Sequence, residues 1–330
     1  MKAKLKIVLK VMISFLLSFI LLSGFVRIYS FSGVHITNNT QATDYTWEPR
    51  QSKANMTEGF SWLSMDSNGF NNLEPISPKI DVLMMGSSHM EAVNVSSNSN
   101  AVSLLNSMFP DIYFYNIGIS GHKIYNVINN IQAAIETFEP TKYVIIETSI
   151  VNLDEETMQQ VIMGNFVRIK SYDSGLVFQV QKKIPLIKTL YKAVEDWRTA
   201  GTHDVEPMIE TETYAETLNA FLKIAKTACG DQVQLIICYQ PATELDNDGS
   251  MICVTNPDSL SLFSRACEDN GIVFVDMTED FQESYQSRSI LPHGFTNTAV
   301  GAGHLNEAGH EMVADRLAIT IREQEAEKNQ

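Results

Sequence analysis

The chain has 330 residues, enough for one large domain or two small ones. Hydrophobic residues make up 44% and charged residues 19%, which permits a substantial core. The formal net charge of -15 argues against nucleic acid or an anionic membrane surface as the main partner.

The N-terminus predicts a helix that targets the chain to a membrane. Four lysines lie at or before the start of the apolar run 11–26, and a positive flank before such a run is typical of a secretory signal or a membrane anchor. The apolar stretch of about 20 residues is near the length that spans hydrocarbon. No small-x-small cleavage site follows Gly24. We therefore expect residues 1–27 to be a basic cytoplasmic flank and an uncleaved signal-anchor helix, with a cleaved signal as the alternative. Everything after about residue 30 would then lie outside the cytoplasm.

Residues 28–78 are polar and rich in Ser, Asn and Thr, but they also carry scattered aromatic side chains. This segment is too aromatic for a pure linker. We expect an extracytoplasmic spacer that ends as a strip on the domain surface. The Asn-x-Ser/Thr triplets at Asn38, Asn55 and Asn94 are interpreted as chance occurrences.

From residue 79 to about 325, short apolar runs alternate with longer amphipathic ones. Buried strands are predicted at 80–85, 112–116, 143–147, 233–238 and 272–276. Helices are predicted at 98–108, 121–138, 210–229, 258–270 and 306–325. This alternation predicts an α/β domain with three layers, helices on both faces of a parallel five-stranded sheet. Active sites in such sheets form at the carboxyl ends of the strands.

Two features fall outside this pattern. The stretch 153–205 is longer than a crossover requires, and its part 177–191 is basic and apolar. It is interpreted as a surface helical insertion, while a lid, a membrane-facing patch and a partner site stay open. The four cysteines lie in the C-terminal third, at Cys229, Cys238, Cys253 and Cys267. An even count in an exported chain permits disulfides, and the sequence does not decide between bridges and free thiols.

The first predicted strand runs into Gly86-Ser87-Ser88-His89, a small-residue turn of the kind that exposes a nucleophile in α/β hydrolytic folds. Ser88 is the candidate nucleophile. Its hydroxyl needs a base to take its proton, and the following helix N-terminus offers N–H groups to an oxyanion. The alternative is that both serines only cap the helix.

The candidate base is His304, in the loop before the last predicted helix. A neutral imidazole can accept the serine proton and later donate it to the leaving group. His310 falls inside the predicted helix and His293 in an upstream loop. His89 directly follows the nucleophile, so we expect it to shape the pocket instead.

Together with Asn116-Ile117-Gly118-Ile119-Ser120-Gly121, these motifs resemble the blocks of the SGNH (GDSL-like) hydrolase family. The first block is similar to the Gly-Ser-Ser-His form of membrane-anchored members that act on cell-envelope polymers. The resemblance implies the flavodoxin-like fold of that family. It also implies that Ser88 and Gly121 contribute oxyanion-hole N–H groups, with Asn152 as a third donor. Thr148 or Ser149 are alternatives to Asn152.

The chain departs from the family where an Asp usually stands three residues before the histidine, because Gly301 occupies that position. Either the site is a Ser-His dyad, or another group orients His304. Candidates are a backbone carbonyl in 294–303, or one of the acidic residues Asp276, Glu279 and Asp280. An impaired site is the third possibility, since losing the carboxylate costs a triad orders of magnitude in rate.

The sequence thus predicts a membrane-anchored serine esterase or acyltransferase. The resemblance implies that its substrate is an O-acyl group, in particular acetyl, on an envelope or exported carbohydrate or another small ester. The alternative is a catalytically weak module that binds glycan or scaffolds a membrane-bound acyltransferase. No Gly-x-Gly-x-x-Gly, P-loop or His-Glu-x-x-His motif is present, so we expect neither a cofactor nor a metal.

Overall fold

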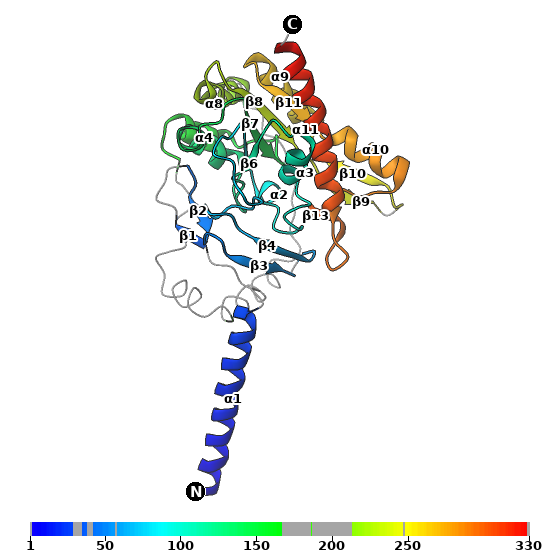
Figure 1. Cartoon of the computed structure of the whole chain (residues 1–330). Coiled ribbons are helices and arrows are strands. Elements are labelled where there is room, and N and C mark those ends of the chain that lie inside the picture. The colour runs from blue at the N-terminus through cyan, green and yellow to red at the C-terminus, as the bar shows by residue number, and fades with distance from the viewer. Residues whose placement is uncertain are drawn as a thin grey trace.

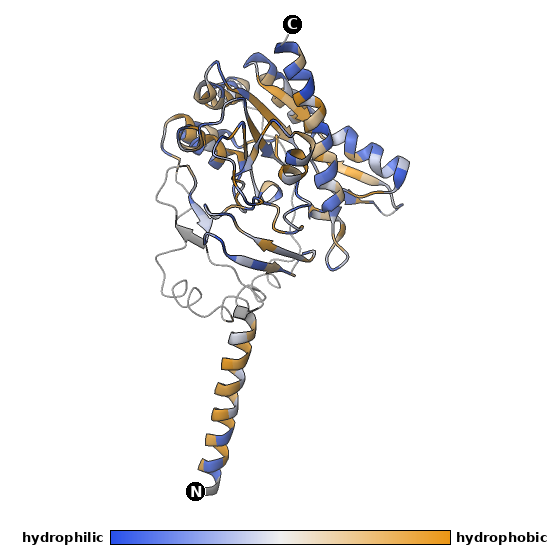
Figure 2. Ribbon diagram, viewed as in Figure 1, coloured by the Kyte–Doolittle hydropathy of each residue, from blue (hydrophilic) through white to orange (hydrophobic). Residues whose placement is uncertain are grey.

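The computed structural model describes residues 2–28, 35–37, 42–56, 58–166, 186, 213–246 and 248–328. Its first element, α1 (Lys2–Ile28), projects from the domain as a single exposed helix (Figure 1). The stretch Lys4–Phe25 is long and apolar enough to cross a membrane, and a signal peptide would have the same properties. Figure 2 shows apolar residues along most of this helix and in the central strands of the domain.

Five parallel strands form the central sheet, in the order β11-β8-β7-β5-β6. Their bounds are β5 (Val82–Met85), β6 (Phe114–Asn116), β7 (Tyr143–Thr148), β8 (Gln234–Tyr239) and β11 (Val273–Asp276). Most of their side chains are buried, as expected when helices cover both faces of a parallel sheet. The predicted α/β class with a five-stranded parallel sheet is confirmed.

Successive strand residues point into two separate hydrophobic cores, one on each face of the sheet. Leu83 and Met85 contribute to the core shared with α4 (Ile124–Phe138), α5 (Glu155–Ile162), α8 (Tyr214–Cys229) and α9 (Pro257–Asp269). Val82 and Met84 contribute to the core shared with α3 (Ala101–Met108), α10 (Thr278–Arg288) and α11 (Glu307–Lys328). The sheet therefore lies between two helical layers, which is the predicted three-layer arrangement.

Four short antiparallel pairs surround the sheet and were not predicted from the sequence. They are β1 (His35–Thr37) with β2 (Tyr45–Trp47), β3 (Ser52–Asn55) with β4 (Ser61–Ser64), β9 (Ala242–Leu245) with β10 (Met251–Val254), and β12 (His293–Gly294) with β13 (Val300–Leu305). The predicted loop position of His304 was therefore wrong, because this residue lies in β13. His293, also predicted in a loop, lies in β12.

All four cysteines are free thiols, so no disulfide forms among them. Most of the unusual stretch 153–205 lies outside the described residues. Within it, α5 packs on the core, and Leu186 is helical and buried.

Candidate active site

The turn after β5 places two serines at the carboxyl end of the sheet. Gly86 permits this turn, because a Cβ there would lie 2.5 Å from a carboxylate oxygen of Glu147. Ser87 is the N-cap of the short helix α2 (Ser88–Glu91), and its hydroxyl accepts a hydrogen bond from the N–H of His89 at 3.3 Å. Ser87 therefore has the capping role, while Ser88 is the first helical residue.

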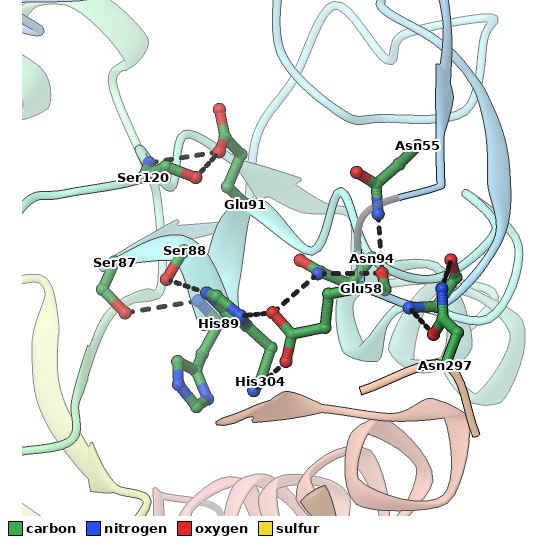
Figure 3. A network of polar contacts seen from close by, with 11 residues as sticks. Asn55, Glu58, Ser87, Ser88, His89, Glu91, Asn94, Ser120, Asn297 and His304 are labelled. Carbon is green, nitrogen blue, oxygen red and sulfur yellow. Dashed lines mark hydrogen bonds and ion pairs between the residues drawn. The ribbon is translucent and has the colours of Figure 1, made fainter. Parts of the chain in front are cut away.

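Ser88 and His304 meet although 216 positions separate them in the chain. The hydroxyl Oγ of Ser88 lies 2.8 Å from Nε2 of His304 (Figure 3). This is the distance that a nucleophile and its general base require. The structure thus brings together the two residues that the sequence singled out.

The other nitrogen of the His304 ring contacts a carboxylate that the sequence analysis missed. Glu58, in the turn between β3 and β4, places Oε2 2.5 Å from Nδ1 of His304. Its Oε1 accepts the backbone N–H of the same histidine at 2.8 Å. Burial raises the pKa of Glu58, but its hydrogen bonds and ion pair with His304 outweigh burial and leave the pKa below the ordinary value. Glu58 is therefore an anion that fixes the His304 ring at two points.

Three asparagines hold the turn that carries Glu58 (Figure 3). The amide groups of Asn55 and Asn94 donate to the carbonyl of Glu58 at 2.7 and 3.2 Å. Asn297, in the loop between β12 and β13, accepts from the N–H of Gly59 at 2.8 Å and donates to the carbonyl of Met56 at 3.1 Å. Asn55 and Asn94 thus help to position this carboxylate. From the sequence, their Asn-x-Ser/Thr triplets were interpreted only as chance occurrences.

Asp276 and Asp280, two of the acidic residues predicted to orient His304, bind other groups. Asp276 accepts from the N–H and hydroxyl of Thr278 at 2.9 and 2.6 Å. Asp280 pairs with Arg316 at 3.1 Å, and Glu279 lies beside it in the first turn of α10. The prediction that one of these three, or a carbonyl in 294–303, orients the ring was wrong, because Glu58 occupies Nδ1.

Gly301, where the family usually has Asp, has no room for a side chain. Its φ of +79° is a conformation that favours glycine, and a Cβ there would lie 2.9 Å from Cγ of Leu245. Its carbonyl accepts the hydroxyl of Thr243 at 2.8 Å. The departure from the family pattern therefore has a steric reason, and the carboxylate reaches His304 from another segment.

The loop after β6 that carries Gly121 is fixed next to α2. Buried Glu91 accepts the N–H of Ser120 at 3.1 Å, and its second oxygen accepts Nε1 of Trp47 at 2.6 Å. The hydroxyl of Tyr45 donates to the carbonyl of Ser120. Gly121 has a φ of +85°, and a Cβ there would meet only that hydroxyl, at 3.9 Å. A substrate oxygen can therefore approach the backbone at this position.

Asn152, the third predicted oxyanion donor, lies in the loop between β7 and α5, and its role stays a prediction. The alternative residue Thr148 uses its hydroxyl locally, donating to the carbonyl of Ile150 at 2.8 Å. The N–H groups of Ser88 and Gly121 have no protein acceptor within the part of the chain that the structure describes. They are therefore available to an oxyanion.

Two further imidazoles lie beside the His304 ring. The centroid of the His89 ring is 5.3 Å from that of His304 and 5.6 Å from that of His293. Burial, followed by the nearby histidines, lowers the pKa of His89 well below its ordinary value. Burial also lowers the pKa of His293 to about 4. Both rings are therefore neutral at neutral pH and give this wall of the site a polar but uncharged surface.

A buried carboxyl group lies under the nucleophile turn. Oε2 of Glu147, on β7, accepts the N–H and the hydroxyl of Ser87 at 2.7 and 2.8 Å. Burial raises the pKa of Glu147, although its hydrogen bonds with Ser87 oppose the shift. Glu147 therefore braces the residue before Ser88 without contacting the reacting hydroxyl. Among the described residues, no group of three or more His, Cys, Asp or Glu side chains could hold a metal ion.

No family model and no curated protein matches the chain. Solved structures similar to it include a two-domain esterase (CEX) active on acetylated mannans, with 15% identity and a TM-score of 0.43 over 74% of this chain and 49% of that one. The chain thus spans about half the length of that esterase. A member of the lipolytic G-D-S-L family from Veillonella parvula has 15% identity and a TM-score of 0.41, over 72% of this chain and 95% of that one. An acetyl xylan esterase, AlAXEase, has 16% identity and a TM-score of 0.42, over 73% and 100%. Two of these three structures are esterases and the third is a member of the lipolytic G-D-S-L family.

Proposed function

We propose that the protein is a serine carboxylic ester hydrolase in which Ser88 is the nucleophile, His304 the general base and Glu58 the orienting carboxylate. The observation that carries this proposal is the continuous hydrogen-bonded chain from Ser88 Oγ through both ring nitrogens of His304 to Glu58. Serine-histidine-carboxylate catalysis is recognised by this geometry and by these roles, not by the order of the residues in the chain.

The charge on Glu58 sets the state of the His304 ring. An ionised carboxylate only accepts hydrogen bonds, so Nδ1 of His304 carries the proton and Nε2 presents its lone pair to Ser88. Nε2 takes the hydroxyl proton as Ser88 attacks the acyl carbonyl, and Glu58 stabilises the imidazolium that forms. The N–H groups of Ser88 and Gly121, with Asn152 as the third donor, bind the developing oxyanion.

The protonated His304 then donates its proton to the leaving alkoxide, which leaves an acyl group on Ser88. Water, activated by the same ring, releases that acyl group in hydrolysis. A sugar hydroxyl in place of water gives acyl transfer by the same steps. The substrate follows from the family resemblance: an O-acyl group, acetyl above all, on an envelope or exported carbohydrate. In this proposal α1 stays in the membrane and the domain lies outside the cytoplasm.

The alternative, a catalytically weak module, was favoured by the missing Asp at Gly301 and by the basic and apolar stretch 177–191, most of which lies outside the described residues. Glu58 fills the orienting position, so the missing Asp no longer favours a weak site. We therefore retain only the enzymatic proposal.

Hydrolysis of 4-nitrophenyl acetate by the full-length protein in detergent micelles tests it. Ser88→Ala is expected to lose several orders of magnitude in kcat, as other serine hydrolases do when the nucleophile is removed. Ser87→Ala is the matched control, because it removes the neighbouring hydroxyl and keeps the nucleophile. Retained activity in the Ser88 variant would refute the assignment of the nucleophile.

A further inference from the structure

The turn that supplies Glu58 has a second, outward-facing side that is apolar. Met56, Phe60 and Trp62 are 52%, 67% and 49% exposed. In the β3–β4 register the last pair is Asn55 with Ser61, and Met56 and Phe60 are the neighbouring residues at the two ends of the turn. Side chains two residues apart along a strand share a face. Phe60 and Trp62 are exposed while Ser61 and Leu63 are buried, and the exposed Met56 lies at the other end of the same turn. These three exposed apolar side chains are called here the β3–β4 apolar face.

The opposite side of the same hairpin is fixed to the catalytic domain. The hydroxyl of Ser61 donates to the carbonyl of Val93 at 2.6 Å, and Leu63 is fully buried. Glu58 points to this side, where it binds His304. The residues of the apolar face therefore lie within a few sequence positions of Glu58, a member of the candidate triad.

With α1 in the membrane, as proposed above, the chain keeps this end of the domain close to the bilayer. Only six residues separate Ile28, the last residue of α1, from His35 at the start of β1. An extended chain spans about 3.5 Å per residue, so these seven steps reach about 25 Å at most. β1 pairs with β2, whose residues Tyr45 and Trp47 contact Ser120 and Glu91 of the site. Figure 1 shows both hairpins, β1–β2 and β3–β4, at the end of the domain nearest α1.

We infer that the β3–β4 apolar face rests on the outer surface of the lipid bilayer, so that the site opens beside lipid and takes an ester carried at the membrane. Tryptophan and phenylalanine are suited to this position, because aromatic side chains favour the interface between headgroups and hydrocarbon. Because the chain has a net charge of -15, it is not attracted electrostatically to an anionic lipid surface, so the contact must depend on apolar side chains. The substrate half of the inference rests on the proposed ester hydrolysis, and the membrane contact rests only on the proposal that α1 stays in the membrane.

Quenching of tryptophan fluorescence by brominated phosphatidylcholine measures the contact directly. The full-length protein is reconstituted in vesicles of this zwitterionic lipid, and the quenched emission is compared between wild type and Trp62→Phe. The control adds Ile319→Trp to Trp62→Phe, since Ile319 is 47% exposed on α11, which runs to the end of the domain away from α1 (Figure 1). We expect a quenched component that disappears with Trp62 and is not restored by the tryptophan at 319.

Equal quenching of wild type and Trp62→Phe would overturn the inference. So would a Trp62 that is unquenched in vesicles and becomes shielded only when a second membrane protein is added, because the face would then be a protein interface.

Activity tests the substrate half. The double variant Phe60→Ser/Trp62→Ser should hydrolyse soluble 4-nitrophenyl acetate at the wild-type rate and lose turnover of an acetylated glycolipid in vesicles. Equal loss on both substrates, or no loss on either, would contradict the substrate half. If the wild type hydrolyses neither substrate, the proposed function and the substrate half both fail, while the quenching result still decides where the face lies.

Discussion

Replacing Glu58 with glutamine perturbs the His304 ring in a way that the geometry specifies. The carboxylate accepts two hydrogen bonds from the same residue, one from its backbone N–H at 2.8 Å and one from Nδ1 at 2.5 Å. A glutamine amide has one acceptor and one donor end, so it cannot satisfy both. The backbone N–H can only donate, whereas the imidazole can move its proton. The amide oxygen should therefore face the backbone and the NH2 group should face Nδ1.

This arrangement protonates Nε2 and leaves it unable to accept the proton of Ser88. In a serine-histidine-aspartate site, the equivalent amide substitution costs about 10,000-fold in kcat through the wrong tautomer. We expect about 1,000- to 10,000-fold here, or about 4–5 kcal/mol of activation free energy. Glu58→Ala should be less impaired than Glu58→Gln, because the partly exposed ring then keeps either tautomer available.

The assay is kcat/KM for 4-nitrophenyl acetate with the full-length variants, with thermal unfolding as the control for the fold. A purely structural role for Glu58 predicts the reverse order, since glutamine preserves shape and one hydrogen bond while alanine preserves neither. A glutamine variant within tenfold of wild type, or one more active than the alanine variant, would refute this reasoning.

Three further predictions follow from the same structure. Gly301→Asp should lower the thermal midpoint and should not restore activity to Glu58→Gln, because its φ of +79° and the side chain of Leu245 exclude a Cβ; rescue would contradict the steric account. Burial lowers the pKa of His310 from 6.5 to about 3, so its contribution to stability is present above pH 6.5 and is lost as the pH falls toward 3. His310→Gln should therefore lose less stability across that range in urea unfolding than wild type, and parallel curves would refute this. Deleting residues 1–78 should abolish esterase activity even in folded protein, because Glu58 is removed with them; wild-type turnover by the shortened chain would count against Glu58.

The central sheet and the two residues Ser88 and His304 could be predicted because the sequence signals for them are local. Each strand is a short apolar run, and Ser88 directly follows one of them in a small-residue turn. His304 stands just before an amphipathic helix in a motif with a matching family position. The β13 strand that contains it was missed, since Val300-Gly-Ala-Gly-His-Leu305 has glycines with positive φ at 301 and 303 and no alternating pattern.

Glu58 could not be predicted, because its role depends on a contact across 246 positions of the chain. It lies between strands of four residues whose polar composition gives no clear period. The only sequence signal was indirect: the segment 28–78 is too aromatic to be a simple spacer. Tyr45 from this segment binds the loop of Gly121, and Trp47 binds Glu91, which also holds that loop, so both aromatic residues contribute to the site. The predicted orienting groups all lie in the segment 276–303, near His304 in the sequence, whereas Glu58 lies 246 positions away from it.

The most direct test of the account is reaction of the full-length protein with a fluorophosphonate probe, with the labelled peptide identified by mass spectrometry. An activated serine reacts with the probe, whereas an ordinary hydroxyl does not, because its proton has no base to accept it. The account predicts labelling at Ser88 that disappears in His304→Ala and is strongly slowed in Glu58→Gln. Folded wild-type protein that is not labelled, or that is labelled at a residue other than Ser88, would contradict it.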